Sequence, residues 1–65
     1  MSKYPDIEVE LIGQDGNAYN LLGRVVKALK SNEVSQDEIN QFLDEATESD
    51  YDNLLRVIMG WVEVI

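Results

Sequence analysis

Carboxylates are the side chains in this sequence that are numerous enough to do chemistry. The chain has 13 acidic residues, and seven of them lie between positions 37 and 52: Asp37, Glu38, Asp44, Glu45, Glu48, Asp50 and Asp52. Asp44 and Glu48 are one helical turn apart, a spacing at which two carboxylates could chelate a hard cation. No further ligands complete a defined geometry around them. We therefore interpret the cluster as a solvated helix face with favourable first-turn carboxylates, and predict no metal.

The run Gly13–Asn17 could be a binding loop or a turn. A calcium loop needs oxygen ligands at alternate positions and a bidentate glutamate further on, and only Asp15 and Asn17 fit that pattern. A phosphate-binding loop needs more glycine and a lysine. We predict a turn in which Asn17 caps the helix that follows.

Cysteine and histidine are both absent from the sequence. Disulfides, thiolate or imidazole zinc sites, and serine–histidine or cysteine–histidine catalysis are therefore excluded. Carboxylates could still act as acid and base, as they do in glycosidases, but such chemistry needs a pocket that desolvates them. A chain of 65 residues has little room for one. We predict a non-enzymatic protein without a cofactor.

The segment Asp6–Leu11 alternates strictly between apolar and polar residues. Ile7, Val9 and Leu11 point to one face, and Glu8 and Glu10 point to the other. This period of two predicts a half-buried β-strand.

Three helices are expected in the middle of the chain. The first, Ala18–Lys30, has a wide apolar arc, which predicts a central position. The second begins with a capping box in which Ser35 accepts from the Glu38 N–H and the Glu38 carboxylate reaches back. The third starts after Ser49 and is interrupted at Gly60. Their expected apolar faces comprise Ala18, Tyr19, Leu21, Leu22, Val25, Val26, Ala28 and Leu29; then Ile39, Phe42, Leu43 and Ala46; then Tyr51, Leu54, Leu55 and Ile58.

The tail Trp61–Ile65 is rich in strand formers, although the helical period could also continue through it. We choose a strand because Asp6–Leu11 needs a partner for its backbone and the tail is the other candidate. On such a strand Trp61 alternates away from Val62 and Val64 and is partly exposed. An exposed tryptophan beside a sheet edge is a natural interface anchor. A simply packed tryptophan is the alternative.

These elements predict a single α+β domain over residues 1–65, with a two-stranded sheet packed on three helices in the order β-α-α-α-β. If each helix spans the domain, the two strands are parallel.

Charged residues are the remaining candidates for an interface. Glu8, Glu10 and Glu63 are expected on the outer face of the sheet, where like charges disfavour strand pairing unless solvent or a basic partner relieves them. Arg24 and Lys27 belong to a positive stripe on the first helix. That stripe could drive self-association between copies, or it could simply complement the helix dipole.

The net charge of −8 limits the classes of partner. It repels nucleic acid and anionic membranes, so we expect neither to be bound directly. The first residues lack the apolar core of a signal peptide, and no apolar stretch is long enough to span a bilayer, so we expect a cytoplasmic protein. We predict that the chain binds a protein partner or itself. The alternative is an acidic DNA mimic that inhibits a nucleic-acid-binding protein.

Several sequence blocks are similar to known sequences: Gly13–Tyr19, Leu22–Val25, Ala28–Lys30 and the later Asp50–Asp52. With them, the chain resembles a group of small uncharacterised bacterial and phage-borne acidic proteins with a Gly-x-Asp-Gly-Asn-Ala block. The group has no assigned activity, so the resemblance implies no catalytic residue. It does make a phage-type inhibitor worth considering.

Overall fold

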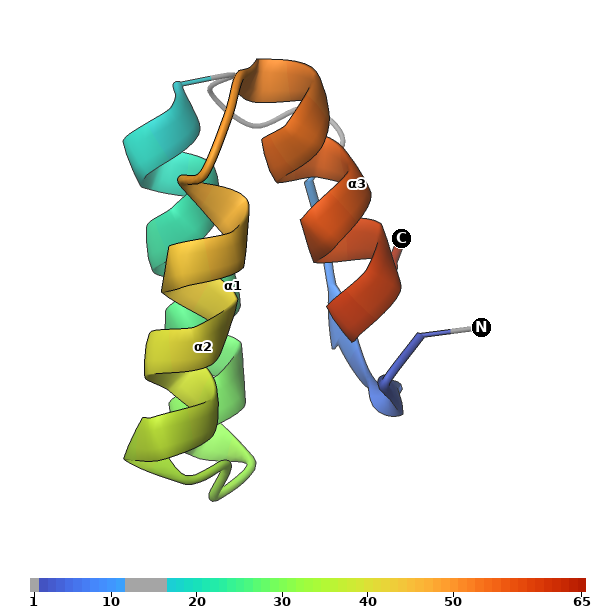
Figure 1. The fold of residues 1–65 in the computed structure, drawn as a ribbon. Helices are drawn as coiled ribbons and strands as arrows, with labels where there is room; N and C mark the ends of the chain where they lie inside the picture. The colour runs from blue at the N-terminus through green and yellow to red at the C-terminus, as the bar shows by residue number, and fades with distance from the viewer. Residues whose placement is uncertain (1, 12–16) are drawn as a thin grey trace.

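A computed structural model describes residues 2–11 and 17–65 of the chain. Within them it shows an α+β fold in which three helices pack on a two-stranded sheet, in the predicted order β-α-α-α-β (Figure 1). The elements are β1 (Tyr4–Val9), α1 (Ala18–Ser31), α2 (Gln36–Ala46), α3 (Tyr51–Trp61) and β2 (Val62–Val64). The predicted turn at 13–17 lies outside the described residues except for Asn17, whose side chain accepts from the Tyr19 N–H at 2.8 Å and caps α1 as expected.

The two strands run parallel, the direction expected if each helix spans the domain. Glu8 aligns with Glu63 and Val9 with Val64, but three residues of β1, Pro5–Ile7, have no counterpart in β2. Pro5 has no N–H with which to complete a rung there, which is consistent with a bulge at this position. β1 begins and ends two residues earlier than predicted, and the segment before it is bonded to α3. The Lys3 N–H donates to the carbonyl of Gly60 at 2.8 Å.

Helix α1 buries Leu21, Val25 and Leu29 and ends in a Schellman motif. The Val34 N–H donates to the Leu29 carbonyl at 3.0 Å, and the Glu33 N–H donates to the Lys30 carbonyl at 3.1 Å. Glu33 adopts a φ of 62°, the left-handed conformation that this motif requires and that glycine usually provides.

Helix α2 begins as predicted but its capping box is incomplete. The Glu38 N–H donates to Ser35 Oγ at 3.3 Å. The reciprocal bond was predicted wrongly, because the Glu38 carboxylate is directed to Lys3 and Tyr4 instead. Helix α2 buries the expected Ile39, Phe42 and Ala46, while Leu43 is half-buried.

The C-terminal end of α3 departs from prediction. The helix continues through Gly60 to Trp61, so both the break at Gly60 and the assignment of Trp61 to a strand were wrong. Continuation places Trp61 on the same face as Ile58 and Leu54, three and seven residues earlier, a spacing that keeps side chains on one helix face. Trp61 is therefore 4% exposed, not partly exposed as predicted.

The core combines apolar residues from every element. α1 and α2 form an antiparallel pair, α3 lies beside them, and β1 runs behind the helices in the view of Figure 1. Two residues expected on apolar faces lie outside the core: Tyr19 is 84% exposed and Tyr51 is 43% exposed. The buried residues are Ile7, Val9, Leu21, Val25, Leu29, Ile39, Phe42, Ala46, Leu54, Ile58, Trp61 and Val62.

Candidate functional site

The structure brings four of the predicted charged interface residues together beside β1 and places the fifth, Glu63, on the neighbouring strand. Glu8, Glu10, Arg24 and Lys27 line a shallow depression of about 220 Å³, together with Val9 and Ala28. Glu63 adjoins them because it pairs with Glu8 in the sheet register. We call the set Glu8, Glu10, Glu63, Arg24 and Lys27 the charged edge, and all five side chains are exposed.

Local periodicity explains how β1 and α1 supply residues of this site. Along β1 the inward-facing Ile7 and Val9 are buried, so the intervening Glu8 faces solvent. Along α1 the inward-facing Val25 is buried, and Arg24 and Lys27 are three residues apart on an adjacent exposed stripe. The packing of α1 against β1 then sets the two stripes beside each other.

The strand backbone at this edge has groups that face away from β2. The Ile65 N–H donates to the carbonyl of Val9 at 3.0 Å, and the Leu11 N–H donates to the carbonyl of Ile65 at 3.4 Å. Ile65 therefore bonds to the two residues on either side of Glu10, which is the pattern of a parallel strand pair. The N–H and C=O of Glu10 point away from β2, and the two-residue repeat of a strand turns those of Glu8 the same way.

Like charges meet at the charged edge, and cations lie close to them. Glu8 and Glu63 are directly aligned on neighbouring strands, an arrangement that disfavours pairing. Ser2 Oγ donates to Glu63 at 3.4 Å. Arg24 and Lys27 line the same depression as Glu8, so α1 supplies positive charge close to the carboxylates. The sequence alone had suggested that solvent or a basic partner relieves their repulsion. At exposed positions such charges stabilise only weakly, by up to about 1 kcal/mol.

Trp61 is not part of this edge. It packs against Phe42 with ring centroids 5.6 Å apart and against Tyr4 at 6.0 Å. Its indole N–H donates to Glu45 Oε1 at 3.1 Å. The expectation of an exposed interface anchor is therefore corrected, because this tryptophan is a core residue.

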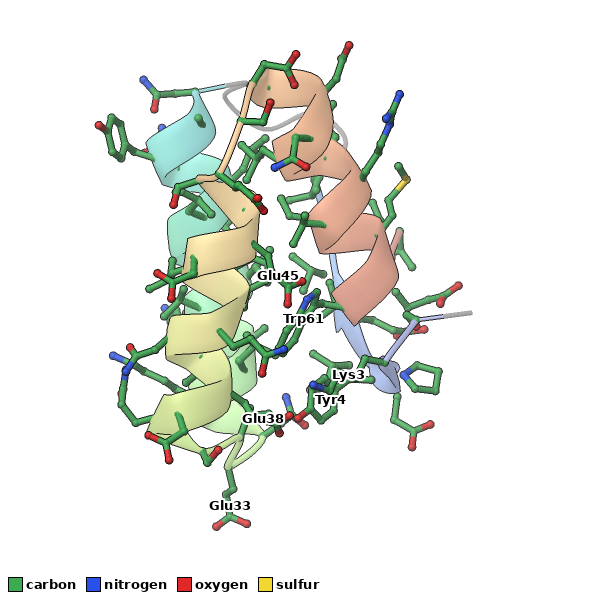
Figure 2. The ribbon with its side chains drawn as sticks, viewed as in Figure 1. Lys3, Tyr4, Glu33, Glu38, Glu45 and Trp61 are labelled. Atoms are coloured by element: carbon green, nitrogen blue, oxygen red, sulfur yellow. The ribbon has the colours of Figure 1, made fainter. Side chains whose placement is uncertain are left out.

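A polar cluster covers Trp61 and joins the N-terminal segment to α2. Lys3 Nζ lies 2.7 Å from Glu38 Oε1 and 4.2 Å from the centroid of the Trp61 ring. The Tyr4 hydroxyl donates to Glu38 Oε2. Figure 2 shows these side chains converging between β1 and α2. Sequence reasoning missed this cluster because its members are far apart in the chain and belong to no local motif.

Among the described residues, the pKa shifts arise from this same cluster and from Glu45 beside it. The bonds from Lys3 and then Tyr4 lower the pKa of Glu38. The bond from the Trp61 indole, followed by that from Gln41, lowers the pKa of Glu45. The pKa of Tyr4 is raised, because its ionisation would cost the bond that it donates to Glu38. These shifts accompany contacts that hold β1 and α3 to α2.

A second depression, of about 270 Å³, lies where the start of α1, the end of α2 and the start of α3 meet. Its walls are mainly apolar, from Leu22, Ala46 and Leu54, with the exposed Tyr19 and Tyr51 at its margin. None of the residues predicted for an interface lines it.

Three further observations concern residues 2–11 and 17–65. In this part of the chain, each buried side-chain nitrogen or oxygen has a hydrogen-bond partner. No group of three or more acidic residues there is placed to hold a metal ion. No helix among these residues has both the length and the apolar character needed to cross a bilayer.

Comparison of the chain with protein-family models, with curated proteins and with solved structures found no match in any of the three.

Proposed function

We propose that this chain is a small non-enzymatic cytoplasmic protein that acts by binding another protein, and that the charged edge is its binding surface. The observation that carries the proposal is the outward-facing backbone of Glu8 and Glu10 beside an open depression. An unpaired strand edge is a template for a further strand, and many peptide-binding proteins use one.

The charge distribution supports the same surface. Arg24 and Lys27 are two of the five basic residues in the chain, and both lie at this edge. Positive and negative side chains side by side discriminate between partners, since a partner with the wrong charge pattern is repelled.

The side chains with shifted pKa values support a non-enzymatic role. The carboxyl groups of Glu38 and Glu45 and the hydroxyl of Tyr4 are engaged in the contacts that hold β1 and α3 to α2. In the described part of the chain, these are the groups whose pKa values are shifted, and all of them have structural partners.

Site-specific photocrosslinking in cells tests the proposal. A photoreactive residue in place of Glu10 or Lys27 should give a defined adduct with one partner. The same residue in place of Asp44, on the exposed side of α2, is the matched control and should give none. An adduct from position 44 with none from the charged edge would move the binding surface elsewhere and contradict the proposal.

An acidic DNA mimic remains the alternative prediction. Two members of the expected carboxylate series, Glu38 and Glu45, have partners within the fold, which shortens the array that could imitate phosphates. Competition separates the two functions, because a DNA mimic should be displaced from its partner by duplex DNA in a salt-dependent manner. A partner held at the charged edge should not be displaced.

A further inference from the structure

We infer that the charged edge takes up an extended segment of its partner in which two basic side chains flank an acidic one, so that the segment adds to the sheet beside β1. This inference rests on the proposed function, and it specifies the chemistry of the segment that is bound.

The backbone determines the conformation of the bound segment. Glu8 and Glu10 each turn one N–H and one C=O away from β2, two residues apart. A strand lying about 4.8 Å from β1 would satisfy these groups with its own alternate residues. A helix could not satisfy them, because its backbone bonds are internal.

The outer face determines one half of the side-chain pattern. On this face the carboxylates of Glu8 and Glu63 are aligned with each other, and Glu10 follows two residues after Glu8. Opposite charges on neighbouring strands stabilise pairing, whereas like charges oppose it. The outward-pointing residues of the added strand are therefore lysine or arginine.

The opposite wall of the depression determines the other half. There α1 presents Arg24 and Lys27, together with the small side chain of Ala28. A residue of the added strand that points inward, between the two basic ones, approaches these cations. An aspartate or glutamate at that position gains an opposite charge on this wall, while a third basic residue would be repelled.

A second copy of this chain does not fit the edge. Pairing β1 with the β1 of another molecule would bring Glu8 and Glu10 of both copies onto one face of a continuous sheet. Four carboxylates on neighbouring strands repel each other. Charge complementarity thus favours a different protein.

The test is an NMR titration of the full chain with two blocked peptides. The probe has the sequence Thr-Lys-Glu-Lys-Thr, and its charge-inverted control is Thr-Glu-Lys-Glu-Thr. The probe should shift the amide signals of residues 8–10 and 24–28 and bind at least about tenfold more tightly than the control, as expected for two cross-strand charge pairs exchanged for repulsion.

Two matched double variants, each changing the net charge by +4, show whether the effect is local. Glu8→Lys with Glu10→Lys should lose the preference for the probe and favour the inverted peptide. The control variant combines Asp44→Lys, on the exposed side of α2, with Glu48→Lys, just after the end of α2. It should bind the probe as the unmodified chain does. Far-UV circular dichroism verifies that both variants are folded, and Arg24→Glu provides a single-residue test of the inner wall.

The outcomes separate this inference from the proposed function. Equal binding of both peptides, or equal loss of binding in both double variants, would mean general charge attraction and would overturn the inference. If position 10 crosslinks to a partner in cells while the probe does not bind, the proposed function stands and the segment chemistry is wrong. Sedimentation that shows a dimer abolished by Glu8→Lys with Glu10→Lys would make a second copy the occupant and would also overturn it.

Discussion

Trp61 connects three elements of the fold through contacts of its single side chain. It packs on Phe42 of α2 and Tyr4 of β1, and its indole N–H donates to Glu45. Trp61→Phe keeps an aromatic ring but removes the donor and part of the volume. We expect it to lower the free energy of unfolding by about 1–3 kcal/mol, measured by urea denaturation with circular dichroism. Met59→Ala, at a residue that is 57% exposed, is the control and should change it by less than about 0.5 kcal/mol. Equal effects would contradict the packing described.

Glu38 gives the molecule a defined response to acid. Its folded-state pKa lies below the ordinary value of 4.5, because Lys3 and Tyr4 stabilise the carboxylate. A lowered pKa means that the stabilisation is present above 4.5 and is lost as the pH falls through the folded-state value. Glu38→Gln should therefore unfold at lower temperature than the unmodified chain at neutral pH, and the difference should shrink below pH 4.5. Thermal unfolding across pH measures this.

The control for that profile is Asp44→Asn, which removes one carboxylate from the exposed side of α2. Comparing the two variants cancels the general relief of repulsion as a chain of net charge −8 is protonated. A gap between Glu38→Gln and the unmodified chain that stays constant down to pH 3 would mean that the Lys3 and Tyr4 contacts do not control the acid response.

At the scale of the element, the end of α1 contains local strain. Glu33 holds a left-handed conformation that costs a residue with a Cβ about 1–2 kcal/mol relative to glycine. Glu33→Gly should accordingly raise the free energy of unfolding by about 1 kcal/mol in urea denaturation. Glu33→Ala removes the same charge but keeps the Cβ, so it should give little of this gain. A gain of equal size in both variants would assign the effect to charge.

The sheet is also destabilised locally, by the pairing of two glutamates on its strands. Glu8 and Glu63 are aligned on adjacent strands, and both are exposed. Glu63→Lys replaces a repulsive pair by an attractive one and should stabilise the fold by about 0.2–1 kcal/mol at low salt. High salt should reduce the gain, because it screens exposed charges. Glu48→Lys, away from the sheet, serves as the control for net charge, and an equal gain there would contradict the register.

Local patterns predicted the elements well wherever one face had to be buried. The alternation of Ile7 and Val9 with Glu8 identified β1, and the spacing of Ile39, Phe42 and Ala46 identified the inner face of α2. Position 61 was misassigned because strand-forming residues continue a helical period there, and packing onto Phe42 decided between the two structures. Local propensity does not contain that packing information.

At the scale of the whole molecule, the residues of the charged edge show the same limit of prediction from local patterns. Their exposure followed from periodicity, but their meeting at one edge depended on how α1 lies against β1. The salt bridge between Lys3 and Glu38 joins the residue before β1 to α2, and no short-range sequence pattern indicates it. Long-range contacts of this kind decide which exposed residues form a surface.

The whole chain is a small domain with one edge of β1 at its surface. With a Cα radius of gyration of 10.6 Å, it buries a single core beneath one short sheet. Proteins usually protect such edges with charged side chains or bulges, and β1 carries both, Glu8 at its edge and the irregularity at Pro5–Ile7. These features disfavour pairing with an uncharged strand, whereas a strand of complementary charge would offset the repulsion.

Amide hydrogen exchange along residues 8–11 tests the central claim most directly. In the unbound chain the amides of Val9 and Leu11, which face β2, should exchange slowly, while those of Glu8 and Glu10 should exchange rapidly. Addition of the Thr-Lys-Glu-Lys-Thr peptide should slow amide exchange at Glu8 and Glu10. The charge-inverted peptide should not protect these amides. Slow exchange at Glu8 and Glu10 in the unbound monomer would show that the edge is already closed, and would contradict the account.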